Sequence, residues 1–489
     1  SQSLLNDWKV EPFFSHFQRV PHDLVGYVEN LQMIRAYVET FAKAVGVRLE
    51  VLDHHDCHLA TAFFCSPFER ANVLSLDARG ELVTAVLAKG EGATLAHLAE
   101  IPMPHSLGML YSAVTQFLGF SLLDGEGSVM GLASYGEDRF ADAFAQIVTP
   151  TSDGFVTQPN DYWSHATVGW LSQVPNGLTR FFGQPRVYRK NPIDGTDEHI
   201  AASLQAATER IGAHLFDLLY QHTGLHDFCL AGGVGLNAKM NGELASHPAV
   251  QNLYVPSAPN DPGCAIGAAF SLYARETGKR PKPPSHAYFG PEYSNDEIKT
   301  ALEETGVTYA TCSDVTTRGA ELLAEGRILG WFQGRMEMGP RALGNRSILA
   351  NPAQQAMKDL VNNRVKHRES WRPFGPSVVA EQRDRYFPTT APAPFMTAAL
   401  ATTAVGQRDL AAAMHVDTTA RAQIVTSEAN PRFHALISEF GKHTGVHGLL
   451  NTSFNLRGEP IVNTPYDAIA MFQRTGLDHL VIGDFVVSG

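Results

Sequence analysis

The segment from Arg327 to Arg372 concentrates arginine beside glycine and proline in an otherwise acidic chain. It holds nine Lys/Arg and three acids, a local charge of +6, whereas the whole chain of 489 residues carries −12. Arginine forks bind phosphate or carboxylate through paired hydrogen bonds, and glycine lets backbone N–H groups approach the same oxygens. The alternative is a solvated basic face, which usually carries lysine at helical spacing. The segment therefore predicts an anion-binding site.

A second set of residues could hold a metal ion. His54 and His58 lie four residues apart in a segment expected to be helical, so both imidazoles leave the same face. Asp77 ends the apolar run NVLSLD, and Asp261 lies in APNDPGCAIGAA, between a strand-like segment and a small-residue helix. Two histidines with carboxylates suit Fe(II), Mn or Zn rather than Ca. The same pair could instead form a hydrogen-bonded structural group.

Two glycine-containing turns are candidates for contact with a nucleotide. DARGE places Asp77 and Gly80 between two expected strands. LAGGVGLNAKMNG, with Gly232, Gly233 and Asn237, joins an expected strand to a helix N-terminus, which favours anions. Neither turn matches the Walker pattern or the dinucleotide fingerprint, and a Gly-Gly turn is most often structural, so neither decides the matter alone.

The elements that must position these residues predict a mixed α/β protein of two domains. Charge, proline and glycine displace any periodic pattern over residues 275–296, and we place a boundary there, giving domains 1–284 and 285–489. The expected elements are a β-hairpin over 71–90, a helix over 199–224 that stops at glycine, helix then strand over 320–334, a helix over 356–368, and strand, turn and strand over 448–462.

Composition narrows the class of protein. No apolar run approaches the roughly 18 residues of a membrane span, and the start SQSLLNDWKVEPFF has no signal pattern, so we expect a cytoplasmic protein with no membrane partner. Five cysteines without C-x-x-C spacing suggest neither a disulfide framework nor a zinc knuckle. A pI of about 5.9 argues against nucleic-acid binding. A homodimer is the default assembly for a globular protein of this size.

Six segments in order resemble the O-carbamoyltransferases of antibiotic and nodulation-factor biosynthesis. They are HHDCHLATAFFCSPFERANVLSLD, GEGSVMGLASYG, LAGGVGLNAKMNG, GRMEMGPRALGNRSILANP, VKHRESWRPFGPSV and NTSFNLRGEPIV, and the similarity runs from residue 51 to the last residue. The resemblance implies an actin-like ATPase (ASKHA) N-terminal domain, similar to the Kae1-like tRNA threonylcarbamoyl transferase. It implies a YrdC-like C-terminal domain, similar to the enzyme that makes threonylcarbamoyl adenylate.

The resemblance also implies a two-step reaction. Carbamoyl phosphate and ATP, which carries Mg²⁺, form carbamoyl adenylate in the C-terminal domain, and the N-terminal domain passes the carbamoyl group to a hydroxyl of a small molecule such as a sugar, aminoglycoside or polyketide. The positions that match the family divide among four tasks. They are Arg341, Arg346, Lys366, Arg372 and Arg421 for the anionic oxygens; Asn451, Ser453, Asn455 and Arg368 for the carbamoyl substrate; Gly80, Gly232, Gly233 and Asn237 for the nucleotide; and His54, His58, Asp77 and Asp261 for a metal, usually iron.

Three departures from the family pattern stand out. A strand-rich segment with a Gly-His-Asp-like turn is expected ahead of this sequence and is not found, so about one strand layer is missing and no base for the acceptor hydroxyl is assigned. Ser128 stands where a lysine is expected. The expected Asp-Gly-Thr-Ala-Arg run begins Asp417-Thr418, and a threonine at a glycine turn restricts φ, which affects the placement of Arg421.

Other functions fit parts of the sequence. A tRNA threonylcarbamoyl enzyme would share both folds but must bind tRNA, against the acidic charge. A nucleotide- and metal-binding regulatory protein without turnover is the non-catalytic alternative. A sugar kinase of the same superfold would leave the arginine block without a purpose. The acceptor is not specified, although Met109, Tyr111 and Tyr135 and the region 160–190 could line its pocket.

Overall fold

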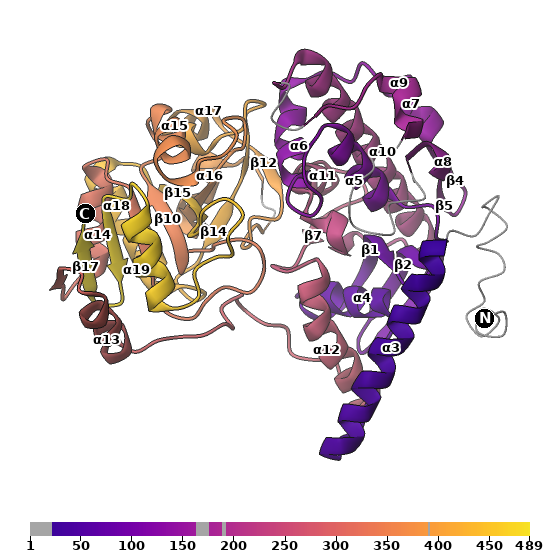
Figure 1. Cartoon of the computed structure of the whole chain (residues 1–489), viewed down its shortest axis with the longest axis horizontal. Helices are drawn as coiled ribbons and strands as arrows, with labels where there is room; N and C mark the ends of the chain where they lie inside the picture. The colour runs from indigo at the N-terminus through magenta and orange to yellow at the C-terminus, as the bar shows by residue number, and fades with distance from the viewer. Residues whose placement is uncertain (1–21, 163–175, 188–191, 390–391) are drawn as a thin grey trace.

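The computed structural model describes residues 22–162, 176–187, 192–389 and 392–489, and it shows two α/β bodies side by side (Figure 1). The N-terminal body, indigo to magenta, is built on a five-stranded sheet. The C-terminal body, orange to yellow, is built on an eight-stranded sheet. The structure therefore confirms the mixed α/β class predicted from the sequence. No helix among the described residues is long and apolar enough to cross a membrane.

The N-terminal body contains the following elements. Its strands are β1 (Arg70–Gly80), β2 (Val83–Glu91), β3 (Thr94–Pro102), β4 (Val148–Thr151), β5 (Gly154–Thr157), β6 (Asp227–Ala231) and β7 (Asn252–Tyr254). Its helices are α3 (His22–Val45), α4 (His54–Phe64), α5 (Leu107–Phe117), α6 (Glu126–Leu132), α7 (Ala141–Ile147), α8 (Pro159–Tyr162), α9 (Thr179–Phe182), α10 (Gly195–Thr223), α11 (Ala238–Ala245) and α12 (Cys264–Thr277).

The C-terminal body follows with these elements. Its strands are β8 (Tyr309–Thr311), β9 (Leu329–Phe332), β10 (Arg346–Ala350), β11 (Gly375–Val379), β12 (Ala399–Ala401), β13 (Thr419–Arg421), β14 (Gln423–Val425), β15 (Gly448–Ser453), β16 (His479–Ile482) and β17 (Phe485–Ser488). Its helices are α13 (Asn295–Thr305), α14 (Val315–Ala324), α15 (Ala356–Val361), α16 (Arg383–Tyr386), α17 (Ala404–Asp409), α18 (Pro431–Thr444) and α19 (Pro465–Arg474).

The N-terminal sheet has the strand order β3-β2-β1-β6-β7, in which β1, β6 and β7 run parallel. Alternate residues of β1 enter different layers: Leu74 and Leu76 pack in the core that contains α5 and α10, whereas Ala71 and Val73 pack against α4. Successive side chains of a strand point to opposite faces, so Asp77 continues the face that meets α4. The period of two thus aims this carboxylate at the helix that carries the histidines.

The C-terminal sheet has the order β14-β11-β15-β10-β9-β16-β17-β8 and is covered on both faces. Helices α14 and α18 contribute to one core cluster, and α13, α15 and α19 contribute to the other. Strand β10 shows the same alternation, because Ile348 belongs to one cluster and Leu349 to the other.

Most of the elements expected from the sequence are present. The hairpin over 71–90 is β1 paired antiparallel with β2, and the helix over 199–224 is α10, which ends at Gly224 in the left-handed region with φ 67°. The helix over 356–368 is shorter, since α15 passes into a π-helical turn at Asn362. The second strand expected within 448–462 is wrong: only β15 forms, because Pro460 lacks a ladder donor and the segment turns back instead.

Candidate active sites: a histidine-aspartate cluster and an arginine pocket

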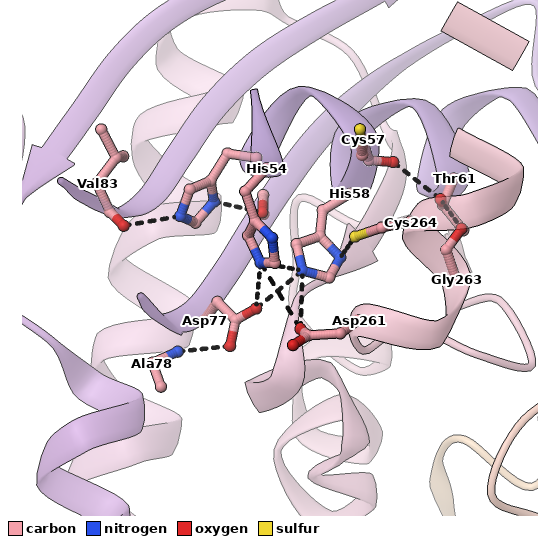
Figure 2. Close-up of polar contacts among 12 residues, drawn as sticks. His54, Cys57, His58, Thr61, Asp77, Ala78, Val83, Asp261, Gly263 and Cys264 are labelled. Atoms are coloured by element: carbon pink, nitrogen blue, oxygen red, sulfur yellow. Dashed lines mark hydrogen bonds and ion pairs between the residues drawn. The ribbon is translucent and has the colours of Figure 1, made fainter. Parts of the chain in front are cut away.

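Four of the residues predicted to bind a metal converge at one edge of the N-terminal sheet (Figure 2). His54 and His58 lie on successive turns of α4, and Asp77 comes from β1. Asp261 follows β7 and begins a short turn before α12. Strands β1, β6 and β7 are parallel, so their carboxyl ends meet at one edge, and the cluster lies there, where α/β sheets commonly bind ligands.

The ligand atoms of the cluster are mutually close. Nε2 of His54 and Nε2 of His58 are 3.0 Å apart, and Asp77 Oδ2 lies 3.2 and 2.8 Å from them. Asp261 Oδ1 lies 3.6 Å from each nitrogen. A metal bound at about 2.0–2.2 Å from its ligands places neighbouring ligand atoms about 3 to 3.5 Å apart. The two nitrogens and two oxygens therefore fit a divalent metal such as Fe(II) or Zn(II).

Hydrogen bonds within the cluster favour an ionised Asp77 and a protonated His58. Burial would raise the pKa of Asp77, but hydrogen bonds from His54 and His58 outweigh burial and hold that pKa below its usual range. Burial would lower the pKa of His58, yet hydrogen bonds with Asp261 and Asp77 outweigh it and hold the pKa above its usual range. A cation is thus favoured where the carboxylates meet the imidazoles, and a metal ion would replace the proton in that role.

The surroundings of the cluster include one residue that the sequence analysis missed. Cys264 Sγ lies 3.5 Å from Nδ1 of His58, on the side of the ring away from the carboxylates (Figure 2). A hydrogen bond on Nδ1 fixes which nitrogen of a ligand histidine faces the metal. The cysteine begins α12 directly after the Asp261 turn, so the adjacent sequence DPGC was the available signal. His55 faces Ser75 and Val83 instead.

The glycines predicted to contact a nucleotide surround the same cluster. A Cβ on Gly80 would lie 2.5 Å from the His54 ring, so the missing side chain makes room for that histidine. Gly232 has φ 93°, a Cβ on it would lie 2.2 Å from Leu76 O, and a Cβ on Gly233 would lie 2.8 Å from Asp77 Oδ1. Close packing accounts for these glycines, and their contact with a nucleotide stays a prediction.

Asn237 has a structural role in the described residues. Its Oδ1 accepts from Met240 N and so caps α11, and the amide is paired in both directions with Gln205. The segment from Gly232 to Lys239 nevertheless connects two places of interest. It starts beside the histidine-aspartate cluster and ends at a second site between the two bodies.

The second site, here called the arginine pocket, lies between the two bodies. Its cations are Lys239 from the N-terminal body and Arg341, Arg368, Arg372 and Arg421 from the C-terminal body. Its remaining wall includes Gly131, Ser134, Tyr135, Trp371 and His415. The sequence predicted three of these arginines for the anionic oxygens and Arg368 for the substrate, and the structure brings all four together. Tyr135 lines the pocket, whereas Tyr111 is a buried core residue bonded to Gln205.

The arginines of the pocket repel one another. Burial, and to a smaller extent Arg372, lowers the pKa of Arg341 to about 10. Burial and Arg372 likewise lower the pKa of Arg368 to about 9, and burial with neighbouring arginines lowers the pKa of Arg421. Among the described residues, Arg341 and Arg421 have no hydrogen-bonding or carboxylate partner, and Nε of Arg421 is buried without an acceptor. An anion with several oxygens would supply what these groups lack.

One carboxylate at the edge of the pocket joins the two bodies. Asp417 Oδ2 accepts from Lys239 Nζ at 2.6 Å and from Ser134 Oγ at 3.1 Å. Trp371 Nε1 also crosses the boundary, donating to Ser128 O at 3.2 Å. Thr418, next to Asp417, has φ 65°, a conformation that is strained for a β-branched residue. The Thr418 departure therefore strains the turn, and Arg421 still reaches the pocket.

Lys366, predicted for the anionic oxygens, lies with the remaining substrate candidates around the turn after β15. Lys366 Nζ donates to the backbone oxygens of Ser453 and Asn455 at 2.7 and 2.9 Å, and to Asn455 Oδ1 at 2.7 Å. Ser453 Oγ donates to the same Oδ1 at 2.6 Å. Lys366 thus fixes the turn, and burial, then Arg368 and Arg372, lower its pKa. Nearby on β15, Asn451 is buried, and its Oδ1 has no hydrogen-bond partner among the described residues.

The structure places Arg346 apart from the arginine pocket. This arginine is fully buried, with its guanidinium 3.7 Å from the centre of the Phe332 ring, and it is not part of the pocket wall. Nη1 donates to Gln333 O at 2.6 Å and Gly334 O at 3.1 Å, and Nη2 donates to Pro291 O at 3.2 Å. It begins β10, whose alternation turns it away from the loop that presents Arg341. Arg346 therefore supports the fold.

Replacing Arg346 by methionine is expected to destabilise the protein rather than to remove a catalytic group. The variant keeps an aliphatic stem over Phe332 but removes the donors to Gln333 O, which is buried, and to Gly334 O, at a cost of about 1–3 kcal/mol. Urea unfolding at 25 °C measures this loss. An unchanged free energy of unfolding combined with lost activity would restore the role predicted from the sequence.

Glu337 is a second residue whose importance sequence reasoning missed. It is buried, and its Oε1 accepts from the backbone N–H groups of Leu343, Asn345 and Arg346 at 2.7, 2.7 and 3.1 Å. These bonds shape the loop that carries Arg341. The only signal in the sequence was an acid inside a cationic segment, which does not by itself distinguish a loop organiser from a surface charge.

Comparison with known proteins places these sites in a family. The description "Carbamoyltransferase N-terminus" matches residues 25–270, and "Carbamoyltransferase C-terminus" matches residues 320–489. The chain therefore belongs to the carbamoyltransferase family and is a transferase. An uncharacterised protein of Synechocystis is 39% identical over 89% of this chain and 75% of its own length.

Two relatives have informative names. The nodulation protein NolO of Bradyrhizobium diazoefficiens is 38% identical over 89% of this chain and 78% of its own length. The 3′-hydroxymethylcephem-O-carbamoyltransferase of Amycolatopsis lactamdurans is 31% identical over 74% of this chain and 64% of its own length. A solved structure of HypF from T. kodakarensis aligns over 49% of this chain at 15% identity with a TM-score of 0.28, which is too low to define the fold.

Proposed function

We propose that this chain is an ATP-dependent O-carbamoyltransferase that works in two steps at the two sites. The observation that carries the proposal is the arginine pocket, in which Arg341 and Arg421 have no partner of opposite charge among the described residues. Family membership supports carbamoyl transfer, and a relative named for a hydroxymethyl acceptor supports a small-molecule hydroxyl as the second substrate. The acceptor would be a sugar, aminoglycoside or polyketide.

The first step would take place in and beside the arginine pocket. Carbamoyl phosphate and Mg-ATP together bring many negative oxygens, which Arg341, Arg372 and Arg421 would neutralise. For the atoms to balance, one water converts carbamoyl phosphate to carbamate and phosphate. A carbamate oxygen then attacks the α-phosphorus of ATP, and pyrophosphate leaves. Asn451 Oδ1, buried and unpaired, would hold the carbamoyl amide, and Lys366 would keep the turn at Ser453 in place.

The second step would use the histidine-aspartate cluster. His54, His58, Asp77 and Asp261 would hold Fe(II) or another divalent metal, because their donor atoms and spacing fit such an ion. When bound, the metal would orient and polarise the adenylate without redox chemistry. Cys264 would keep Nε2 of His58 directed at the ion by accepting from Nδ1. The segment from Gly232 to Lys239 runs from this cluster to the arginine pocket.

We also propose the finer description of the fold. The strand order β3-β2-β1-β6-β7 supports an actin-like N-terminal domain, and the mostly antiparallel eight-stranded sheet supports a YrdC-like C-terminal domain divided from it at residues 284/285. The two sheets lie wholly on opposite sides of that boundary, and β7 and α13 are joined through α12 and an irregular segment.

Incubating the purified protein with carbamoyl phosphate and Mg-ATP, without acceptor, tests the proposal most directly. Mass spectrometry is expected to detect carbamoyl adenylate, with pyrophosphate and phosphate released in equal amounts. A sample without carbamoyl phosphate is the control for simple ATP hydrolysis. Binding of ATP with no adenylate would contradict the proposal and favour a regulatory homologue.

A further inference from the structure

His415 offers a buried, unpaired ring nitrogen at the wall of the arginine pocket. Its side chain is only 9% exposed, and among the described residues Nε2 has no hydrogen-bond partner. The residue sits in the tight turn that precedes β13, where its backbone N–H donates to Thr419 O at 2.8 Å. The sequence analysis did not single it out, because a lone histidine in an irregular segment carries no spacing signal.

The hydrogen bonds around the ring determine which nitrogen carries the proton. Thr419 Oγ1 donates its one hydrogen to Asp417 Oδ1 at 2.7 Å, since a carboxylate can only accept. Toward His415 Nδ1, 3.1 Å away, the same hydroxyl can therefore only accept. Nδ1 must carry the hydrogen, so in the neutral ring Nε2 is a bare acceptor.

Asp417 is ionised, so its Oδ1 can only accept from Thr419. Burial would raise its pKa, but hydrogen bonds from Lys239 and Thr419 outweigh burial and hold the pKa below its usual range. The ring itself stays neutral: burial lowers the pKa of His415 to about 3, with Arg421, Lys239 and Lys358 adding to the effect against Asp417. The acceptor at Nε2 therefore persists throughout the physiological pH range.

The acceptor at Nε2 cannot bond to anionic oxygens, so it has a role in the pocket only if the ligand also carries a hydrogen-bond donor. Arg341, Arg372, Arg421 and Lys239 are all donors and suit anionic oxygens. A buried acceptor without a donor costs free energy, so the ligand is expected to supply an N–H or O–H group. Carbamoyl phosphate combines an anion with an uncharged amide in one small molecule.

We infer that His415 is a specificity residue whose Nε2 accepts a hydrogen bond from the carbamoyl N–H of carbamoyl phosphate in the arginine pocket. The inference rests on the proposed function, which makes carbamoyl phosphate the source of the carbamoyl group. A site that hydrogen-bonds a substrate group rejects the analogue that lacks it. The residue thus distinguishes carbamoyl phosphate from acetyl phosphate, in which a methyl group replaces the amide.

Binding measurements by calorimetry with freshly prepared carbamoyl phosphate and acetyl phosphate test the inference. The wild type is expected to prefer carbamoyl phosphate by roughly tenfold, and His415→Phe to bind both equally, with acetyl phosphate affinity unchanged. His415→Gln, whose Oε1 can reach the position of Nε2, should restore most of the preference. Thr419→Val should weaken the preference, because without the hydroxyl the hydrogen of the His415 ring is no longer fixed on Nδ1. Thr419→Ser keeps the hydroxyl and is the matched control.

The outcomes separate this inference from the proposed function. If the wild type binds neither carbamoyl phosphate nor ATP, the proposed function fails. If it binds both and His415→Phe keeps its preference, the inference fails. If His415→Phe loses only ATP affinity, the inference also fails, and ATP is the ligand that His415 meets. Nitrogen NMR of the histidine-labelled wild type is independent of any variant: a hydrogen found on Nε2 of His415 instead of Nδ1 would overturn the inference.

Discussion

Replacing Arg341 by methionine is expected to abolish carbamoyl adenylate formation while making the ligand-free protein more stable. Arg341 lines the arginine pocket, and among the described residues it has no hydrogen-bonding or carboxylate partner. Its charge is therefore available to the substrate oxygens. Loss of one donor that stabilises developing charge lowers rates by about 100- to 1000-fold. Release of pyrophosphate from carbamoyl phosphate and ATP measures the effect.

The sign of the stability change follows from the pKa. Burial and repulsion lower the pKa of Arg341 to about 10, so the charged guanidinium is less favourable in the folded than in the unfolded state. This cost is fully present below pH 10 and diminishes only as pH rises through the folded pKa. Because the side chain is partly exposed, removing the charge at pH 7 should gain only about 1 kcal/mol. Methionine retains the packing of the stem.

Thermal unfolding and a matched arginine make the Arg341 test decisive. Arg327→Met removes an exposed arginine outside the pocket and should change neither the melting temperature nor adenylate formation. Added carbamoyl phosphate should raise the melting temperature of the wild type more than that of Arg341→Met. Unchanged pyrophosphate release, or a large loss of stability in Arg341→Met, would give Arg341 the supporting role that the structure assigns to Arg346.

The comparison of Arg341 with Arg346 shows what the sequence can and cannot predict. Both lie five residues apart in the same cationic segment, and charge counting treats them alike. In the fold, one is presented by a loop that Glu337 shapes, and the other begins a buried strand. The difference depends on backbone direction and on which carbonyls lie nearby. Neither property is encoded in spacing over a few residues, so the sequence grouped Arg346 with arginines that the fold places apart from it.

The histidine-aspartate cluster was more predictable because its geometry is local. Residues four apart on a helix share a face, which fixes His54 beside His58, and strand alternation aims Asp77 at the same helix. Asp261 is distant in sequence, and only its place between a strand-like segment and a helix made it a candidate before the resemblance was considered. The sequence could not identify His415 and Lys239 as site residues, because their place in the pocket depends on how the two bodies pack around Asp417.

Replacing His54 by alanine is expected to block carbamoyl transfer while sparing adenylate formation. The imidazole is one of four converging donor groups of the proposed metal site, and its loss should lower metal content and reduce transfer by at least about 100-fold. Treating the wild type with a chelator should likewise block transfer while sparing adenylate formation. His97→Ala, which removes a histidine paired with Asp56 and Glu100 outside the cluster, is the control.

The measurement for His54→Ala follows both steps in the same sample. Carbamoyl adenylate and pyrophosphate report the first step, and carbamoylated product reports the second, with acceptors screened from 3′-hydroxymethylcephem and simple sugars. Mixing His54→Ala with Arg341→Met adds a further comparison: product would form only if carbamoyl adenylate leaves one molecule and enters another. Loss of both steps in a folded, metal-depleted His54→Ala protein would contradict the division of labour, because the arginine pocket would then depend on a cluster that shares no ligand with it.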